Sequence, residues 1–140
     1  MNEINYAPYA ALLLRLTLGV MFVAHALLKW FVFTLPGTAG FFASVGLPGF
    51  LGYVVFAMEL VGGIMLIAGT YTRVVSLALF PILVGAAWVH MPNGWVFSAQ
   101  NGGWEYPVFL AMTTLVLAIL GDGAYNLREI MGSKAKPGLA

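Results

Sequence analysis

The chain has 140 residues, of which 61% are hydrophobic and 8% are charged, and its formal net charge is +1. About a quarter of the residues of a soluble domain are charged, so this composition excludes an ordinary soluble domain and predicts an integral membrane protein. The small net charge offers no basic surface for nucleic acid, and the length leaves no room for a separate catalytic domain beside a membrane bundle.

The chain contains no cysteine, which removes thiolate chemistry from its candidate functions. Disulfide relays, thiolate-bound iron–sulfur clusters and thiolate zinc sites all depend on cysteine. Any electrons that this protein handles would therefore need a bound cofactor or a partner subunit.

Four apolar segments follow one another along the chain, separated by short polar or Pro/Gly-rich stretches. A helix needs ~20 apolar residues to cross ~30 Å of hydrocarbon. The predicted fold class is therefore all-α, an integral membrane four-helix bundle that forms a single domain over residues 1–140. The last helix is the shortest of the set, because acids bound it at both ends. The expected helices cover about 8–30, 50–70, 73–90 and 105–121, followed by a short polar tail at 122–140.

The positive residues of the connections predict that both termini are cytoplasmic. Cytoplasmic loops of membrane proteins carry an excess of Lys and Arg, and the connection at 91–104 contains neither. We therefore expect a multi-pass protein of the cell's inner membrane, with 91–104 facing outward. The residues that carry this prediction are Arg73, Arg128, Lys134 and Lys136.

The other outward connection covers 31–49. Its stretch from Thr38 to Val45 predicts a short interfacial helix, ended by a Gly and a Pro that follow it. We expect an aromatic belt at the same membrane face, formed by Trp30, Trp95 and Trp104.

The start of the chain has an alternative interpretation as a cleaved secretory signal. Arg15, an apolar run at 16–23 and a small-x-small triplet at 24–26 resemble such a signal and its cleavage site. The apolar character continues past the triplet into an aromatic cluster, which favours a spanning helix. An intact mass of the purified protein decides between the two interpretations.

Three ionisable residues share roughly one face of the first helix: Arg15, His25 and Lys29. A charge at mid-membrane costs at least ~2.5 kcal/mol, so this face is expected to point into the bundle or a wet cavity. For Lys29 there is an alternative, in which its ammonium group extends to the outer headgroups.

Glu59 is the deepest acid of the chain, near the middle of the second helix. Counting from the cytoplasmic ends places Arg15 ~10 Å deep and Glu59 ~16 Å deep, a gap that an arginine side chain can span. We therefore expect an Arg15–Glu59 pair. Such a pair either fixes the helix register or allows Glu59 to exchange protons.

On the outward side, His25, His90 and Glu105 come from three different helices and are expected at one depth. A quinone site needs a group that exchanges protons, aromatic walls and an entrance from lipid. Two imidazoles could instead hold haem, with Met91 as a further soft ligand, but the spacing is not diagnostic and no metal site is predicted. The candidate proton-exchange residues are His25, Glu59 and Glu105, and the candidate quinone pocket comprises Arg15, His25, Lys29, His90, Trp104 and Glu105.

Five short motifs, which follow one another along nearly the whole chain, resemble the pattern of the DoxX family. The closing segment departs from the family pattern, because Asn126 and Arg128 stand where a Ser and an Asp are usual. The resemblance implies a four-helix membrane protein, and some relatives are described as subunits of thiosulfate:quinone oxidoreductase or of membrane redox complexes. The motifs are Arg15-Leu16-x-Leu18-Gly19 with Phe22, His25 and Lys29, then Glu59-x-x-Gly62-Gly63, Thr72-Arg73, Gly102-Gly103-x-Glu105 and Gly121-x-Gly123.

The leading hypothesis is a membrane subunit of a quinone-linked redox system, which passes electrons between a partner protein and the quinone pool. Haem is the less favoured cofactor, and the chain acts beside a redox partner or as a homo-oligomer in the lipid bilayer. The alternatives are a non-enzymatic assembly or scaffold protein, in which polar substitutions change only partner recovery or stability, and a small transporter, for which a liposome flux assay is the test.

Overall fold

The computed structural model describes residues 4–134, and every regular element among them is a helix. The all-α prediction is therefore confirmed. Lys136, one of the charges behind the predicted orientation, lies outside the described residues, as does the rest of the tail beyond 134. The elements are α1 (Ala7–Phe31), α2 (Leu35–Ser44), α3 (Phe50–Ala68), α4 (Thr72–His90), the 3-10 turn η1 (Met91–Asn93), α5 (Glu105–Leu120) and α6 (Leu127–Lys134).

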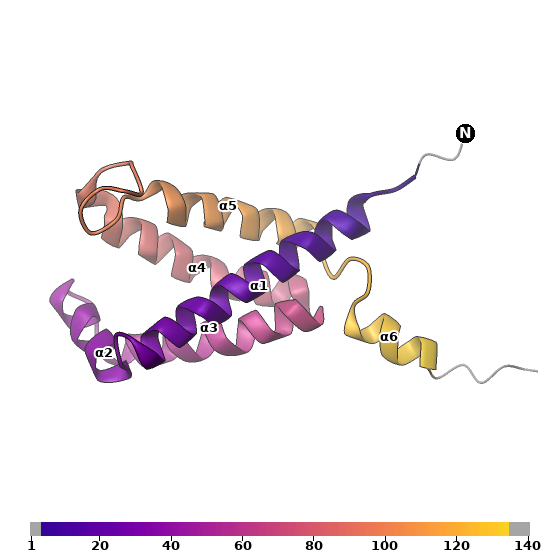
Figure 1. Cartoon of the computed structure of the whole chain (residues 1–140), viewed down its shortest axis with the longest axis horizontal. Helices are drawn as coiled ribbons and strands as arrows, with labels where there is room; N and C mark the ends of the chain where they lie inside the picture. Colours follow the sequence, from indigo (N-terminus) through magenta and orange to yellow (C-terminus); the bar gives the residue numbers. More distant parts are fainter. Residues whose placement is uncertain (1–3, 135–140) are drawn as a thin grey trace, which may run out of the picture.

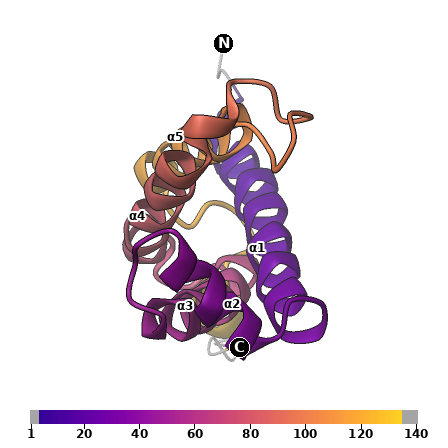
Figure 2. The same cartoon turned by 90° about the vertical axis from the view of Figure 1, so that its left-hand side faces the viewer.

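The four longest helices run side by side as two antiparallel pairs (Figures 1 and 2). α1 packs along α3 and α4 packs along α5, and these are the two most extensive helix contacts. We call one end of the bundle the Arg15 end: it holds the start of α1, the end of α3, the start of α4, the end of α5, and α6. The opposite end, the α2 end, holds α2, η1 and the loop that leads into α5 (Figure 1).

Three of the helices are long and apolar enough to cross a membrane: α1, α3, and α4 taken together with η1. α5 is apolar but has only 16 residues, which gives ~24 Å of helix. A fourth crossing therefore stays a prediction. So does the cytoplasmic location of the Arg15 end, although α6 and the start of α1 do lie at the same end (Figure 1).

The ends of the helices follow from local sequence. α3 ends where Gly69 takes a left-handed conformation with φ 71°, and the amide of Gly69 donates to the carbonyl of Leu66. The next helix begins at Thr72, whose amide donates to the carboxylate of Asp122 at 2.9 Å. A carboxylate accepts from a free amide at a helix N-terminus and is stabilised by the positive end of the helix dipole. Asp122 therefore connects the start of α4 to the end of α5.

Small residues allow α1 and α3 to approach closely. A Cβ atom placed on Gly19 would lie 2.8 Å from the carbonyl oxygen of Gly63, and one on Gly63 would lie 2.8 Å from the carbonyl oxygen of Gly19. In a membrane, helices associate through such close packing because lipid removes the hydrophobic driving force between them. The two glycines therefore fix the register of α1 against α3.

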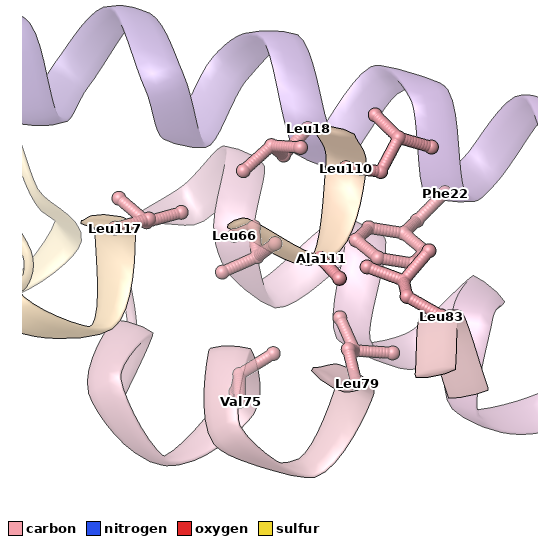
Figure 3. Close-up of a cluster of buried hydrophobic side chains, with 9 residues drawn as sticks. All are labelled: Leu18, Phe22, Leu66, Val75, Leu79, Leu83, Leu110, Ala111 and Leu117. Carbon is pink, nitrogen blue, oxygen red and sulfur yellow. The ribbon is translucent and has the colours of Figure 1, made fainter. Parts of the chain in front are cut away.

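The core lies between the two helix pairs. Leu66 and Leu117 are fully buried there, and Phe22 of α1 reaches into the same cluster (Figure 3). These side chains hold α1 and α3 against α4 and α5, and so they set the positions of the polar groups on either side. The cluster consists of Leu18, Phe22, Leu66, Val75, Leu79, Leu83, Leu110, Ala111 and Leu117.

The helix predicted at Thr38 to Val45 is present as α2 and begins three residues earlier. Thr34 accepts the amide of Gly37 on its hydroxyl oxygen at 3.1 Å and thereby caps the helix. Gly46, with φ 83°, follows the C-terminus as expected. α2 lies across the end of the bundle rather than along it (Figures 1 and 2).

Candidate functional site

Arg15 is buried at the Arg15 end, where its side chain is bonded to four backbone carbonyls. Nη1 donates to Ile67 at 2.8 Å and to Leu66 at 3.3 Å, and Nη2 donates to Ala124 and Tyr125, both at 2.8 Å. The carbonyls at a helix C-terminus lack helical partners and carry partial negative charge. A guanidinium group therefore binds the end of α3 and the segment after α5 at once.

The predicted Arg15–Glu59 pair does not form. Glu59 instead pairs with Lys29, whose Nζ lies 2.6 Å from Oε2. Both side chains are largely buried, with 15% and 7% of their surface exposed. The alternative in which Lys29 extends to the headgroups is therefore not the arrangement seen.

The direction of helical side chains explains this correction. Because Gly19 faces Gly63, Arg15 is level with Ile67, and Glu59 lies eight residues before Ile67, or ~12 Å along the axis. Each Cα–Cβ bond leans toward the N-terminus of its own helix. In this antiparallel pair Arg15 and Glu59 lean apart, whereas Lys29 and Glu59 lean toward each other. Counting depth alone ignored these directions.

His25 lies one helical turn before Lys29 on α1 and packs against Tyr106 of α5. The two rings are stacked with centroids 6.4 Å apart and an interplanar angle of 26°. The Nδ1 atom of His25 lies 2.9 Å from the carbonyl oxygen of Met21. Since a carbonyl can only accept, this bond places a hydrogen on Nδ1, and in the neutral ring Nε2 is then the atom that can take up a proton.

Glu105 begins α5 and holds the preceding loop in place. Its Oε1 accepts the amide of Phe97 at 3.2 Å, and its own amide donates to the carbonyl of Trp95 at 3.1 Å. Trp104 stands edge-on to Trp95 with ring centroids 4.4 Å apart. The carboxylate is therefore positioned by backbone and bordered by aromatic rings.

These residues border an open groove of about 500 Å³ on the side of α5 near the α2 end. Its walls are almost entirely apolar, and Glu105, Tyr106 and Trp95 are the lining residues whose side chains carry a polar group; the hydroxyl of Tyr106 donates to the sulfur of Met21. Ligand pockets generally have ~300–1,000 Å³ and few polar groups, and the volume and the apolar walls of this open groove fall within that range. Its lining consists of Trp95, Phe97, Glu105, Tyr106, Val108, Phe109 and Met112.

His90 is held away from this groove. Its Nδ1 lies 2.7 Å from the carbonyl oxygen of Ala86, and a side chain on Gly102 would meet the imidazole at 3.3 Å. Asn93 donates to the carbonyls of Asn101 and Gly102 and closes the loop over this region. His90 is therefore packed under the loop that follows α4.

The structure thus divides the predicted site residues into three groups. Arg15 lies at the opposite end of the bundle, so it does not join the others. Lys29 and Glu59 pair between α1 and α3, and His25, one turn before Lys29, packs against Tyr106 of α5. Glu105 borders the groove and Trp104 stands edge-on to Trp95 of its wall, whereas His90 does not line it.

The predicted quinone pocket did not include most residues of the groove wall. Tyr106, Phe109 and Met112 are spaced by three along α5, and that spacing places them on one face of a helix. This signal was present in the sequence. The contribution of Phe97 depends on how the loop folds back, which no helical period indicates.

Comparison with known proteins places these features in a family. The model of the DoxX family matches residues 10–92, which include Arg15, His25, Lys29, Glu59 and His90. Among curated proteins, the chain is 36% identical over 111 residues to a Bacillus subtilis protein named "Putative oxidoreductase CatD". The alignment covers 79% of this chain and 78% of the Bacillus protein.

A second relative extends over more of the chain. An uncharacterized protein of Haemophilus influenzae is 32% identical over 134 residues, which is 91% of this chain and 95% of that one. No solved structure matches. The similarity therefore runs through the groove and the segment after α5, beyond the range of the family model.

Proposed function

We propose, from the premise that this chain belongs to the DoxX family, that it is a quinone-interacting subunit of a membrane redox system. It is a multi-pass membrane protein whose helices contact the lipid bilayer. The name of the Bacillus relative supports a redox role. The finer proposal, that the ligand is a quinone, depends on the groove beside Glu105.

The groove suits a quinone in its size, its walls and its polar groups. Aromatic side chains from α5 and the loop, Tyr106, Phe109 and Phe97, offer flat apolar surface for a ring. The Glu105 carboxylate lies at the edge of these walls. A bound quinone would supply two-electron, two-proton redox chemistry.

The residues of the chain would hold the ring and exchange its protons. Glu105 is at the groove, and His25 lies beside its wall, with its ring stacked on Tyr106. The Nε2 atom of His25 is the free acceptor of that ring. The chain has no cysteine to carry electrons, so we propose that a redox partner protein in the same membrane supplies them. In a bacterium this membrane would be the inner membrane.

A binding titration tests this proposal. The protein is placed in lipid nanodiscs, and a short-chain naphthoquinone is added while tryptophan fluorescence is followed, because Trp95 lines the groove. We expect saturable quenching, which Phe109→Ala and Glu105→Gln weaken by about tenfold, or ~1.4 kcal/mol. Ile119→Ala, on the exposed face of the same helix outside the groove, is the matched control.

Two results would contradict the proposal. The first is quenching that rises linearly without saturation and is equal in all four proteins. The second is a lipid extract of the freshly purified protein that contains no more quinone than an unrelated membrane protein prepared alongside. An oxidised-minus-reduced spectrum of the same sample tests the haem alternative.

A further inference from the structure

The surface of the α2 end is apolar to an extent unusual for a face in water. Apart from tryptophan, six large side chains of residues 31–44 and 94–104 are at least half exposed, and four of the six are phenylalanines. Removing such a side chain from water stabilises a protein by about 1.5–3 kcal/mol, so leaving all six in water would be costly. The six are Phe31, Val32, Phe33, Phe41, Val96 and Phe97.

This end also lacks charge. Residues 30–58 and 74–104 contain no Asp, Glu, Lys or Arg. The charged side chains nearest to it are Lys29 and Glu59, which are paired and buried, and Glu105, which accepts a backbone amide. The Arg15 end differs, because Arg73, Asp122, Arg128 and Glu129 lie there.

The hydroxyls of the 31–49 segment are satisfied within the segment. Thr34 accepts the amide of Gly37, Thr38 donates to the carbonyl of Thr34 at 2.9 Å, and Ser44 donates to the carbonyl of Phe41 at 2.7 Å. In lipid a polar group without a partner costs several kcal/mol, so internal bonding of this kind suits a segment removed from water.

The irregular loop after η1 is bonded in the same way. The amides of Trp104 and Glu105 donate to the carbonyls of Gly94 and Trp95, and the amide of Phe97 donates to the Glu105 carboxylate. Its exposed polar side chains gather at the tip, residues 98–101. The loop therefore has an apolar base with internally bonded backbone and a polar tip.

We propose that the α2 end is immersed in the membrane, so that α2 and the base of the loop lie at the boundary between acyl chains and headgroups. Lipid is the occupant of this surface because the surface continues the lipid-facing sides of the helices. Leu27 and Leu28 of α1 and Val54 of α3 are exposed directly below it. Trp30 and Trp95, both half exposed, lie at the depth where such rings favour the interface.

Immersion has a consequence for the groove. A groove at this depth opens sideways into lipid, so its ligand arrives by diffusion within the membrane. This consequence rests on the proposed function, whereas the immersion itself does not. The chemical class that fits is a ring with a long apolar tail.

The absence of native cysteine makes a depth measurement direct. Single cysteines replace Phe41, Val96, Gln100 and Arg128 in turn and carry a spin label in liposomes of the purified protein. Their collisions with oxygen, which concentrates in lipid, are compared with those of a water-soluble nickel chelate. We expect F41C and V96C to favour oxygen over nickel by about tenfold relative to R128C at the Arg15 end, and Q100C to be intermediate.

Nickel access at F41C and V96C equal to that at R128C would overturn the proposal. So would labels shielded from both reagents, because a second copy of the chain would then cover the surface. Two further sites, F33C and, as the lipid-facing reference, Ile64→Cys within α3, keep the test valid if one variant does not fold. The quinone titration is carried out in the same liposomes and scored separately. If the labels are exposed to water and the quenching is saturable, only the immersion is contradicted. If the labels are exposed to lipid and there is no saturable quenching, only the proposed function is contradicted.

Discussion

The two ends of the bundle treat their polar groups in opposite ways. At the Arg15 end the buried charge and the capping carboxylate are held by backbone: both terminal nitrogens of Arg15 donate to carbonyls, four in all, and Asp122 accepts the amide of Thr72. At the α2 end His25 keeps one ring nitrogen free and Glu105 borders a groove. The comparison indicates that the polar groups of the Arg15 end hold the helices together. At the α2 end, His25 and Glu105 have polar atoms that are not used in this way.

The largest effect is expected from removing the anchor of the Arg15 end. Arg15→Ala leaves carbonyls of two segments without their donor, and hydrogen bonds to charged groups contribute about 1.5–3 kcal/mol each. Since four such bonds are lost, we expect a loss of stability on the order of 6 kcal/mol or more, seen as a lower midpoint of thermal unfolding in detergent. Arg15→Lys should recover only part of it, because a single ammonium cannot span both pairs of carbonyls. Equal midpoints for Arg15→Ala and the wild type would contradict the anchoring role.

The next effect concerns the ion pair that lies between the ends. Removing one partner of a buried pair costs about 3–5 kcal/mol when the other charge stays buried. Lys29→Met leaves the Glu59 carboxylate buried in α3 without a partner. Glu59→Gln leaves Lys29 unpaired near the end of α1, where its ammonium group can reach the headgroups. We therefore expect Lys29→Met to lower the unfolding midpoint more than Glu59→Gln does. The double variant should be less destabilised than the two single losses add up to, and strict additivity would argue against the pair.

A smaller effect is expected where the helices touch. Gly63→Ala places a methyl group 2.8 Å from the carbonyl oxygen of Gly19, and overpacking of this kind costs about 1–3 kcal/mol. Gly85→Ala is the matched control, since nothing lies within 4 Å of a Cβ at that position of α4. That control should be neutral or stabilising by up to ~1 kcal/mol, because Ala favours a helix. The order of the two unfolding midpoints is the test.

The smallest effect should come from the cap. Asp122→Ala removes the acceptor of the Thr72 amide and is expected to cost ~1 kcal/mol, while Asp122→Asn keeps an acceptor and should cost less. Hydrogen exchange of the first turn of α4 localises the change. If both variants protect that turn as well as Asp122 does, the cap has been assigned wrongly.

The sequence predicted the features of the fold that depend on composition and on residue spacing. Apolar length placed α1, α3 and α4 to within a few residues, and the Gly and Pro that follow α2 marked its end. Glu105 was expected at a helix start beside aromatic rings, and it is there. These features depend on local sequence and on the thickness of a bilayer, which is the same for every chain.

What the sequence did not predict depends on side-chain direction and on loop closure. The partner of Glu59 was misassigned because two residues of suitable depth, Arg15 and Lys29, share one face of α1. The choice between them depends on the antiparallel register set by Gly19 and Gly63. The groove wall from Phe97 depends on a loop whose shape is fixed by hydrogen bonds to residues that follow it.

The four carbonyls around Arg15 also bear on how the chain is made. Two of them belong to the end of α3, and the other two, at Ala124 and Tyr125, follow α5 and are synthesised after all four long helices. A nascent chain that has inserted α1 and α3 therefore holds a guanidinium with half of its acceptors. The first helix acquires its final partners only when the last long helix is complete, so a chain that stops before residue 124 leaves Nη2 of Arg15 without both of its acceptors.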